Sequence, residues 1–332
     1  MNRITTVDVH VAGEPLRVIT GGFPKPDGHT ILEKREFCRQ HLDHLRRALV
    51  LEPRGHADMY GALPVTPTNP EADVGVLFLH NEGYSTMCGH GIIGLVTVLI
   101  EEGLVEAREP ETTLHIETPS GLVTAVAQID QGRVQSVAFR NVPSFVIDLD
   151  QTIAVPGIGT VRYDLAFGGA FYAFCQADAL GLTLTPHHAR SLAELGMRIK
   201  HAIIKTRSIP HPVEPDLGFL YGIILVGPPT NSQASCRHVC IFGDGALDRS
   251  PTGTGVSAHL AILAARGHIT DHTPYVMESI LGSTFTGKIV DRLTFHDIPA
   301  IIPEVEGQAY LTGKHEFVID PDDPLKTGFR LS

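Results

Sequence analysis

The strongest constraint on the fold of this chain is that three of its segments recur in the same order. Cys-Gly-His-Gly at 88–91, before a mainly apolar stretch to Gly103, resembles Thr-Gly-Thr-Gly at 252–255, before a similar stretch to Gly267. Residues 7–13 likewise resemble residues 163–169, and residues 117–121 faintly resemble residues 278–282. The paired segments start 156, 164 and 161 residues apart. Alternating strands and glycine turns can look alike anywhere, but three pairs in one order favour a duplicated unit.

Each copy is predicted to begin with alternating strands and turns and to continue through a glycine-rich turn into a helix. In the first copy the predicted strands are 5–11, 17–20, 74–80, 114–118 and 122–127. The segments after Cys88 and after Thr252 are apolar nearly all round, which predicts buried helices. A further, solvent-facing helix is expected near residues 31–49.

The predicted fold class is therefore α+β, with two similar domains, each a curved β-sheet or barrel around a central buried helix. Residues 1–128 together with 309–332 are expected to form the first domain, which carries Cys88. Residues 129–308 are expected to form the second domain, which carries Asp248 and Thr252.

Bulk composition limits the class of protein. The 332 residues carry 26 Lys and Arg against 37 Asp and Glu, a net charge of −11. This acidic balance argues against nucleic acid and anionic membrane surfaces as partners. Five cysteines, an odd number at low density, favour reduced thiols over a disulfide framework. With no apolar leader pattern at the N-terminus, we expect a cytoplasmic protein.

The two glycine-rich turns are candidate anion sites. The start of a helix leaves backbone N–H groups unpaired at the positive end of the helix dipole, which suits a carboxylate as well as a phosphate. The same field favours the thiolate form of Cys88, with His90 two residues away. A thiolate beside a bound carboxylate is placed to remove the adjacent α-proton as a general base. The other interpretation is an inert buried thiol.

Thr252 occupies the corresponding position in the second copy. An alcohol is barely ionised near neutral pH unless a base activates it. A mechanism with one base on each face of a carbon is therefore incomplete in this chain, whereas a mechanism with a single base is intact.

The turns at residues 87–91 and 248–255 resemble the two signature turns of the proline racemase superfamily, and the segments 10–15 and 55–61 are similar to further family segments. The resemblance covers essentially the whole chain. It implies two pseudo-symmetric domains of the diaminopimelate-epimerase type, a substrate in the cleft between them, and no cofactor. Racemases of the family have a cysteine in both turns, whereas the Cys88/Thr252 combination is similar to that of the trans-3-hydroxy-L-proline dehydratases.

The resemblance also implies roles for individual residues. Cys88 would be the catalytic base, and Asp248 would pair with the ring nitrogen, although a loop Asx-turn is its other interpretation. The remaining residues would meet the substrate, with Tyr60 standing where the family more often has Phe: Gly89, His90, Thr252, Gly253, Thr254, Tyr60 and Phe242.

The expected activity is hydro-lyase elimination of water from trans-3-hydroxy-L-proline to Δ1-pyrroline-2-carboxylate. Two alternatives stay open: a proline or hydroxyproline racemase or epimerase, and a non-catalytic amino-acid-binding protein. The expected partner is a cyclic imino acid, and a homodimer is left open.

The remaining motifs predict no further site. Cys236, His238 and Cys240 are too few ligands for a closed zinc site and alternate as in a strand, so no metal site is predicted. The segment 253–255 lacks the Gly-Lys-Ser/Thr ending of a phosphate loop. Most histidines are expected at the surface, and Cys38 and Cys175 are expected to be packing residues.

Overall fold

The computed structural model describes residues 2–331, which divide into two compact units. Unit 1 consists of the chain up to Phe139 together with the segment that begins at Gln308. Unit 2 is Arg140–Gly307. The boundary that we expected after residue 128 falls inside strand β7 (Gly121–Asp130), which belongs wholly to unit 1. The C-terminal segment returns to unit 1 through strand β18 (Ala309–Ile319), which pairs antiparallel with β1 (Asn2–Val11).

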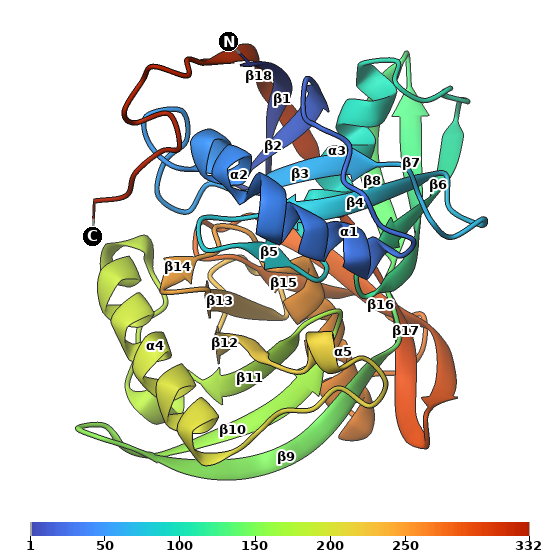
Figure 1. The fold of residues 1–332 in the computed structure, drawn as a ribbon. Helices are drawn as coiled ribbons and strands as arrows, with labels where there is room; N and C mark the ends of the chain where they lie inside the picture. The colour runs from blue at the N-terminus through green and yellow to red at the C-terminus, as the bar shows by residue number, and fades with distance from the viewer. Residues whose placement is uncertain (1, 332) are drawn as a thin grey trace. The chain divides into compact units, whose positions relative to one another are not determined.

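Unit 1 is built on a mixed sheet in the order β18-β1-β2-β3-β4-β6-β7 (Figure 1). The β2–β3 and β4–β6 pairs are parallel and the others are antiparallel. Its remaining strands are β2 (Glu14–Gly21), β3 (Gly61–Val65), β4 (Val74–Leu79), β5 (Tyr84–Ser85), β6 (Glu111–Thr118) and β8 (Arg133–Arg140).

Unit 2 is a closed barrel, because the pairings run β9-β10-β11-β12-β13-β15-β16-β17 and return to β9. Closure leaves no sheet edge exposed within the ring. The strands are β9 (Ser144–Val155), β10 (Gly159–Phe167), β11 (Phe171–Gln176), β12 (Leu220–Gly227), β13 (Cys236–Phe242), β14 (Ala246–Leu247), β15 (Tyr275–Glu278), β16 (Thr284–Phe295) and β17 (Ile298–Gly307).

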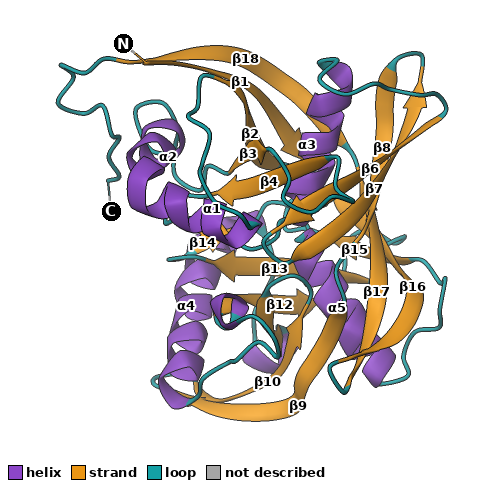
Figure 2. Ribbon diagram, turned by 45° about the vertical axis from the view of Figure 1, so that its right-hand side comes forward, coloured by secondary structure: helices purple, strands orange, loops and turns teal. Residues whose placement is uncertain are grey.

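A buried helix crosses the concave side of each sheet (Figure 2). Helix α3 (Gly89–Glu101) packs on β1, β2, β7 and β18, and α5 (Gly253–Ala265) packs on β9, β10, β11, β16 and β17. In unit 2 the amphipathic helix α4 (Ala189–Thr206) covers the outside of β12 and β13. Three single turns of 3₁₀ helix complete unit 2, at Asp178–Leu180, Pro186–His188 and Pro215–Leu217. No helix within residues 2–331 is long and apolar enough to cross a membrane. The predicted α+β class with a buried helix in each unit is confirmed.

The faintest of the three repeats has a specific structural meaning. Glu117 and Glu278 stand at the ends of β6 and β15, which pair in parallel with β4 and β13. Glu117 accepts hydrogen bonds from the backbone N–H and hydroxyl of Thr68 at 2.5 and 2.6 Å. Glu278 accepts the same two bonds from Thr230 at 2.7 and 2.8 Å. Shared strand order and shared carboxylate contacts establish the duplication.

Each buried helix has a glycine where it meets the sheet. A Cβ on Gly91 would lie 2.4 Å from the Phe78 ring, and a Cβ on Gly255 would lie 2.3 Å from Ile224. Both distances are shorter than carbon atoms tolerate, so a larger residue at either position would force the Phe78 ring or the end of the Ile224 side chain to shift. These two glycines occupy the same place in the two repeated motifs.

The segment 31–50 is less regular than predicted. It forms α1 (Ile31–Phe37), a π-helical turn (Cys38–Leu42) and α2 (Asp43–Val50). The expected helical segment does face solvent on one side, while the other face of α2 and the side chain of Cys38 belong to the core of unit 1. The arginines and histidines that suggested solvent occupy the other face, while Arg46 is buried against the carbonyl oxygens of His80 and Asn81.

Candidate active site

Cys88 is the N-cap residue of α3. Its backbone is extended, with φ −146°, so the side chain folds back and Sγ accepts a hydrogen bond from the Gly91 N–H at 3.2 Å. The thiol is 5% exposed. A sulfur that accepts from the first turn of a helix lies where negative charge is stabilised. This geometry favours the interpretation of Cys88 as a functional thiol over an inert one.

His90 lies against the same sulfur. Its Nδ1 is 3.3 Å from Cys88 Sγ, and its ring meets the Tyr60 ring edge-on at 4.8 Å between centroids. The Tyr60 hydroxyl is hydrogen-bonded to Ser85 Oγ at 2.5 Å, and its ring stacks on His80. Burial lowers the pKa of His80, against the opposing effect of Glu82. Cys88 therefore sits at one end of a packed group of hydroxyl and imidazole side chains.

Thr252 precedes α5 in a different conformation from Cys88. Its φ is +66°, a left-handed backbone that is costly for a β-branched residue, and its side chain does not cap the helix. Instead its hydroxyl donates to Asp248 Oδ2 at 2.8 Å. The Thr252 N–H also donates to Ser250 Oγ at 3.1 Å. These two hydrogen bonds keep Thr252 in its strained conformation.

Asp248 uses both carboxylate oxygens within its own turn. Oδ1 accepts from the Ser250 N–H at 2.7 Å, which is the Asx-turn of the alternative interpretation, and Oδ2 accepts from Thr252. The carboxylate is 4% exposed. Asp248 is thus both a turn residue and a buried negative charge fixed beside the start of α5.

Aromatic residues flank the second turn. Phe242, at the end of β13, stacks on Tyr221 with the two rings 5.5 Å apart and 15° from parallel. The Tyr172 hydroxyl is 2.7 Å from Thr254 Oγ1, and burial raises the pKa of Tyr172 well above its ordinary value. The hydroxyl of Thr254 is consequently fixed in orientation at the first turn of α5.

The predicted site residues therefore form one group in each unit. Unit 1 brings together Tyr60 and the turn at 88–90, and unit 2 brings together Phe242, Asp248 and the turn at 252–254. Sequence reasoning missed the residues that support them: Ser85, His80, Tyr172, Tyr221 and Ser250. Continuous apolar runs mark β4 and β12 as buried strands, but nothing in the sequence indicates which residues beside them face the turns.

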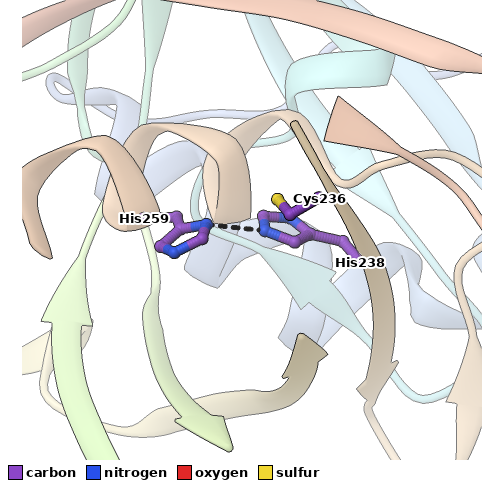
Figure 3. Close-up of side chains that lie close together, drawn as sticks. All are labelled: Cys236, His238 and His259. Atoms are coloured by element: carbon purple, nitrogen blue, oxygen red, sulfur yellow. Dashed lines mark hydrogen bonds between the residues drawn. The ribbon is translucent and has the colours of Figure 1, made fainter. Parts of the chain in front are cut away.

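A second group of polar side chains lies inside unit 2 and includes none of the predicted site residues. Figure 3 shows Cys236 and His238 on one strand facing His259 of α5. Their ligand atoms lie within 4.8 Å of one another, and all three side chains are buried. The strand predicted for residues 236–240 is confirmed as part of β13. Most histidines are exposed or partly exposed, as expected, but His238 and His259 are buried.

Two units with the same strand order, each with a glycine-rich turn that begins a buried helix, define a duplicated α+β enzyme fold. The chain belongs to the proline racemase family, whose model, described as proline racemase, matches residues 6–330. It is 46% identical over 328 residues to the trans-3-hydroxy-L-proline dehydratase of Colwellia psychrerythraea, covering 99% of this chain and 92% of the relative. It is 42% identical to the proline racemase of Clostridioides difficile, covering 99% of this chain and 98% of the relative.

Among solved structures, the chain is similar to a hydroxyproline epimerase from Agrobacterium vitis with bound trans-4-hydroxy-L-proline. The TM-score is 0.95 at 36% sequence identity, covering 100% of this chain and 95% of the other. Relatives with different reactions thus share this fold at full length, so the reaction has to be argued from the site.

Proposed function

We propose that this enzyme eliminates water from trans-3-hydroxy-L-proline, with Cys88 as its single base. The observation that carries the proposal is the unlike pair of residues at the two helix starts. Cys88 offers a sulfur that accepts from a helix N–H, whereas the Thr252 hydroxyl donates its hydrogen to Asp248. A carboxylate is too weak a base to ionise an alcohol near neutral pH, so the Thr252 hydroxyl does not replace the second thiol that racemisation uses.

The stereochemistry of the substrate fits a single base. In trans-3-hydroxy-L-proline the carboxylate and the 3-hydroxyl lie on opposite faces of the ring, so the α-hydrogen and the hydroxyl share a face. The Cys88 thiolate takes the α-proton, and the C3–O bond breaks as the C2–C3 double bond forms. The leaving oxygen is protonated by the Cys88 thiol or through His90, which lies 3.3 Å from the sulfur. The enamine product then tautomerises to Δ1-pyrroline-2-carboxylate.

The other site residues stabilise charge in this scheme. We propose that the buried Asp248 carboxylate accepts a hydrogen bond from the protonated ring nitrogen. The first N–H groups of α3 and α5, at Gly89, His90, Gly253 and Thr254, meet the substrate carboxylate and the negative charge that develops beside it. The Tyr60 and Phe242 rings pack against the substrate ring.

The relatives named trans-3-hydroxy-L-proline dehydratase support this assignment, and the racemase and epimerase relatives support the alternative of inversion at the α-carbon. The test is to incubate the enzyme separately with trans-3-hydroxy-L-proline, L-proline and trans-4-hydroxy-L-proline. Formation of Δ1-pyrroline-2-carboxylate from the first, with no inversion of the other two, is the expected result. Inversion of either without loss of water from the first would overturn the proposal in favour of a racemase or epimerase. Binding without reaction would indicate an amino-acid-binding protein.

A further inference from the structure

The buried group of Cys236, His238 and His259 has the composition and spacing of a metal site. Cys236 and His238 are alternate residues of β13 and point to the same side of the strand, toward His259 of α5 (Figure 3). His238 Nε2 and His259 Nδ1 are 2.8 Å apart, and the three ligand atoms lie within 4.8 Å of one another. Metal–ligand bonds of roughly 2.0–2.3 Å allow two ligands of one ion to be up to about 4.5 Å apart. The three atoms thus need only small movements to surround one ion.

A hydrogen bond to the backbone orients His238 in the way that is common for metal-binding histidines. Its Nδ1 lies 3.3 Å from the carbonyl oxygen of Pro251, which accepts a hydrogen, so Nδ1 carries the hydrogen and Nε2 presents its lone pair to the group. Metal-binding histidines usually donate their other ring N–H to a carbonyl or carboxylate in this way. His259 is held by stacking of its ring on Phe174 at 5.4 Å between centroids.

The charge of the site selects the ion. A thiolate and two neutral imidazoles carry a net charge of −1, so a monovalent cation makes the buried site neutral, whereas a divalent one leaves an uncompensated positive charge in the interior. Sulfur and imidazole ligands suit copper and zinc, but structural zinc sites take four ligands. Within residues 2–331 the group comprises three ligands and no carboxylate. We therefore infer that these residues form a three-coordinate site for Cu(I).

Binding of Cu(I) would release one proton and involve no change of oxidation state. In the free protein one hydrogen lies between His238 Nε2 and His259 Nδ1. As Cu(I) bonds to Cys236 Sγ, His238 Nε2 and His259 Nδ1, the thiol loses its proton to solvent. The hydrogen of His259 moves to Nε2 of the same ring. The copper stays monovalent throughout.

The cluster borders a cavity and contacts the second turn. His259 lines a cavity of about 440 Å³ in unit 2, together with Phe174, Asp164 and Arg266. His238 contacts Pro251, the residue before Thr252. An ion held here would tie β13 to the helix that begins at Thr252, so it is expected to stabilise unit 2 against unfolding.

The test is Cu(I) binding by the full chain under anaerobic conditions against a chromogenic Cu(I) chelator. It uses the Cys88→Ser protein, because Cys88 and His90 form a second cysteine–histidine pair. We expect one equivalent of Cu(I) to be retained, with a higher melting temperature. Cys236→Ser and His259→Gln in the same background should abolish both effects. Cys240→Ser, a buried cysteine on the same face of β13, is the matched control and should keep them.

Retention of the same equivalent after Cys236→Ser would overturn the inference, as would a site that takes Zn²⁺ and not Cu(I). X-ray absorption at the copper edge tests the assignment without altering the buried group, in case a variant fails to fold. One sulfur and two nitrogen neighbours are expected, and two or more sulfurs would contradict the site.

Discussion

Thr252 donates its hydroxyl hydrogen to Asp248 Oδ2 across 2.8 Å, within one buried turn. The two residues that distinguish the second turn from the first are therefore coupled. The Thr252 hydroxyl stabilises the Asp248 carboxylate by donating a hydrogen bond to it. The same bond stabilises the left-handed conformation of Thr252, φ +66°. In the proposed reaction this leaves Cys88 as the group that handles protons.

Removal of the Thr252 hydroxyl should weaken catalysis through Asp248. Thr252→Val keeps the shape of the side chain but leaves one carboxylate oxygen without its donor. A hydrogen bond to a charged group contributes about 1.5–3 kcal/mol, so kcat/KM is expected to fall roughly 10- to 100-fold. Thr252→Ser keeps the hydroxyl and should stay within a few-fold of the parent. An equal loss of kcat/KM in both variants would mean that the hydrogen bond from the Thr252 hydroxyl does not contribute to catalysis.

A thiol at the second turn should restore part of a two-base mechanism. Thr252→Cys is expected to gain measurable inversion of L-proline or trans-4-hydroxy-L-proline, at the cost of some dehydration, because the Asp248 contact is weakened. Chiral chromatography of the amino acids after incubation is the measurement. A variant with no detectable inversion would indicate that a cysteine at this position is insufficient.

Cys88→Ser should remove the base and leave the fold intact. General base catalysis contributes about 10²- to 10⁴-fold, so kcat for dehydration should fall by at least 100-fold. The melting temperature should change little, because serine keeps an acceptor for the Gly91 N–H. Near-parental turnover in this variant would contradict the role given to Cys88.

The buried Arg237–Glu278 pair should control acid stability. Burial would raise the pKa of Glu278, but hydrogen bonds from Arg237 and Thr230 outweigh it and lower the pKa to about 2. The folded pKa is below the ordinary 4.5, so the unfolded chain binds the proton first as pH falls. The stabilisation is complete above about pH 4.5 and is lost between there and about pH 2.

Arg237→Met is expected to cost about 3–5 kcal/mol of unfolding free energy at pH 7, because it leaves a buried carboxylate unpaired. Urea unfolding at several pH values measures both effects, and the variant should lose less stability than the parent on acidification. Glu117 accepts the same two threonine hydrogen bonds in unit 1, so Glu117→Gln is the control that removes a carboxylate charge from this type of contact while keeping the Arg237–Glu278 pair. If Arg237→Met unfolded with the same pH dependence as the parent, the pair would not be responsible.

The sequence was sufficient for the duplicated α+β fold, because hydrophobic patterning and glycine turns are local signals. It was sufficient to single out Cys88 and Thr252 as residues at helix starts. It could not give the Thr252–Asp248 bond, which depends on a left-handed backbone that β-branched residues rarely adopt. Nor could it bring His259 to Cys236, since that contact arises only when the barrel closes around α5. The burial of Arg46 could not be predicted either, because the carbonyl oxygens that it contacts are distant in sequence.

The most direct test of the central proposal is an NMR time course with trans-3-hydroxy-L-proline in deuterated water, run in parallel with L-proline. The account predicts that the hydroxyproline signals disappear as Δ1-pyrroline-2-carboxylate appears, and that L-proline is not inverted. Deuterium incorporation at the α-carbon of the hydroxyproline, with inversion and without loss of water, would contradict it.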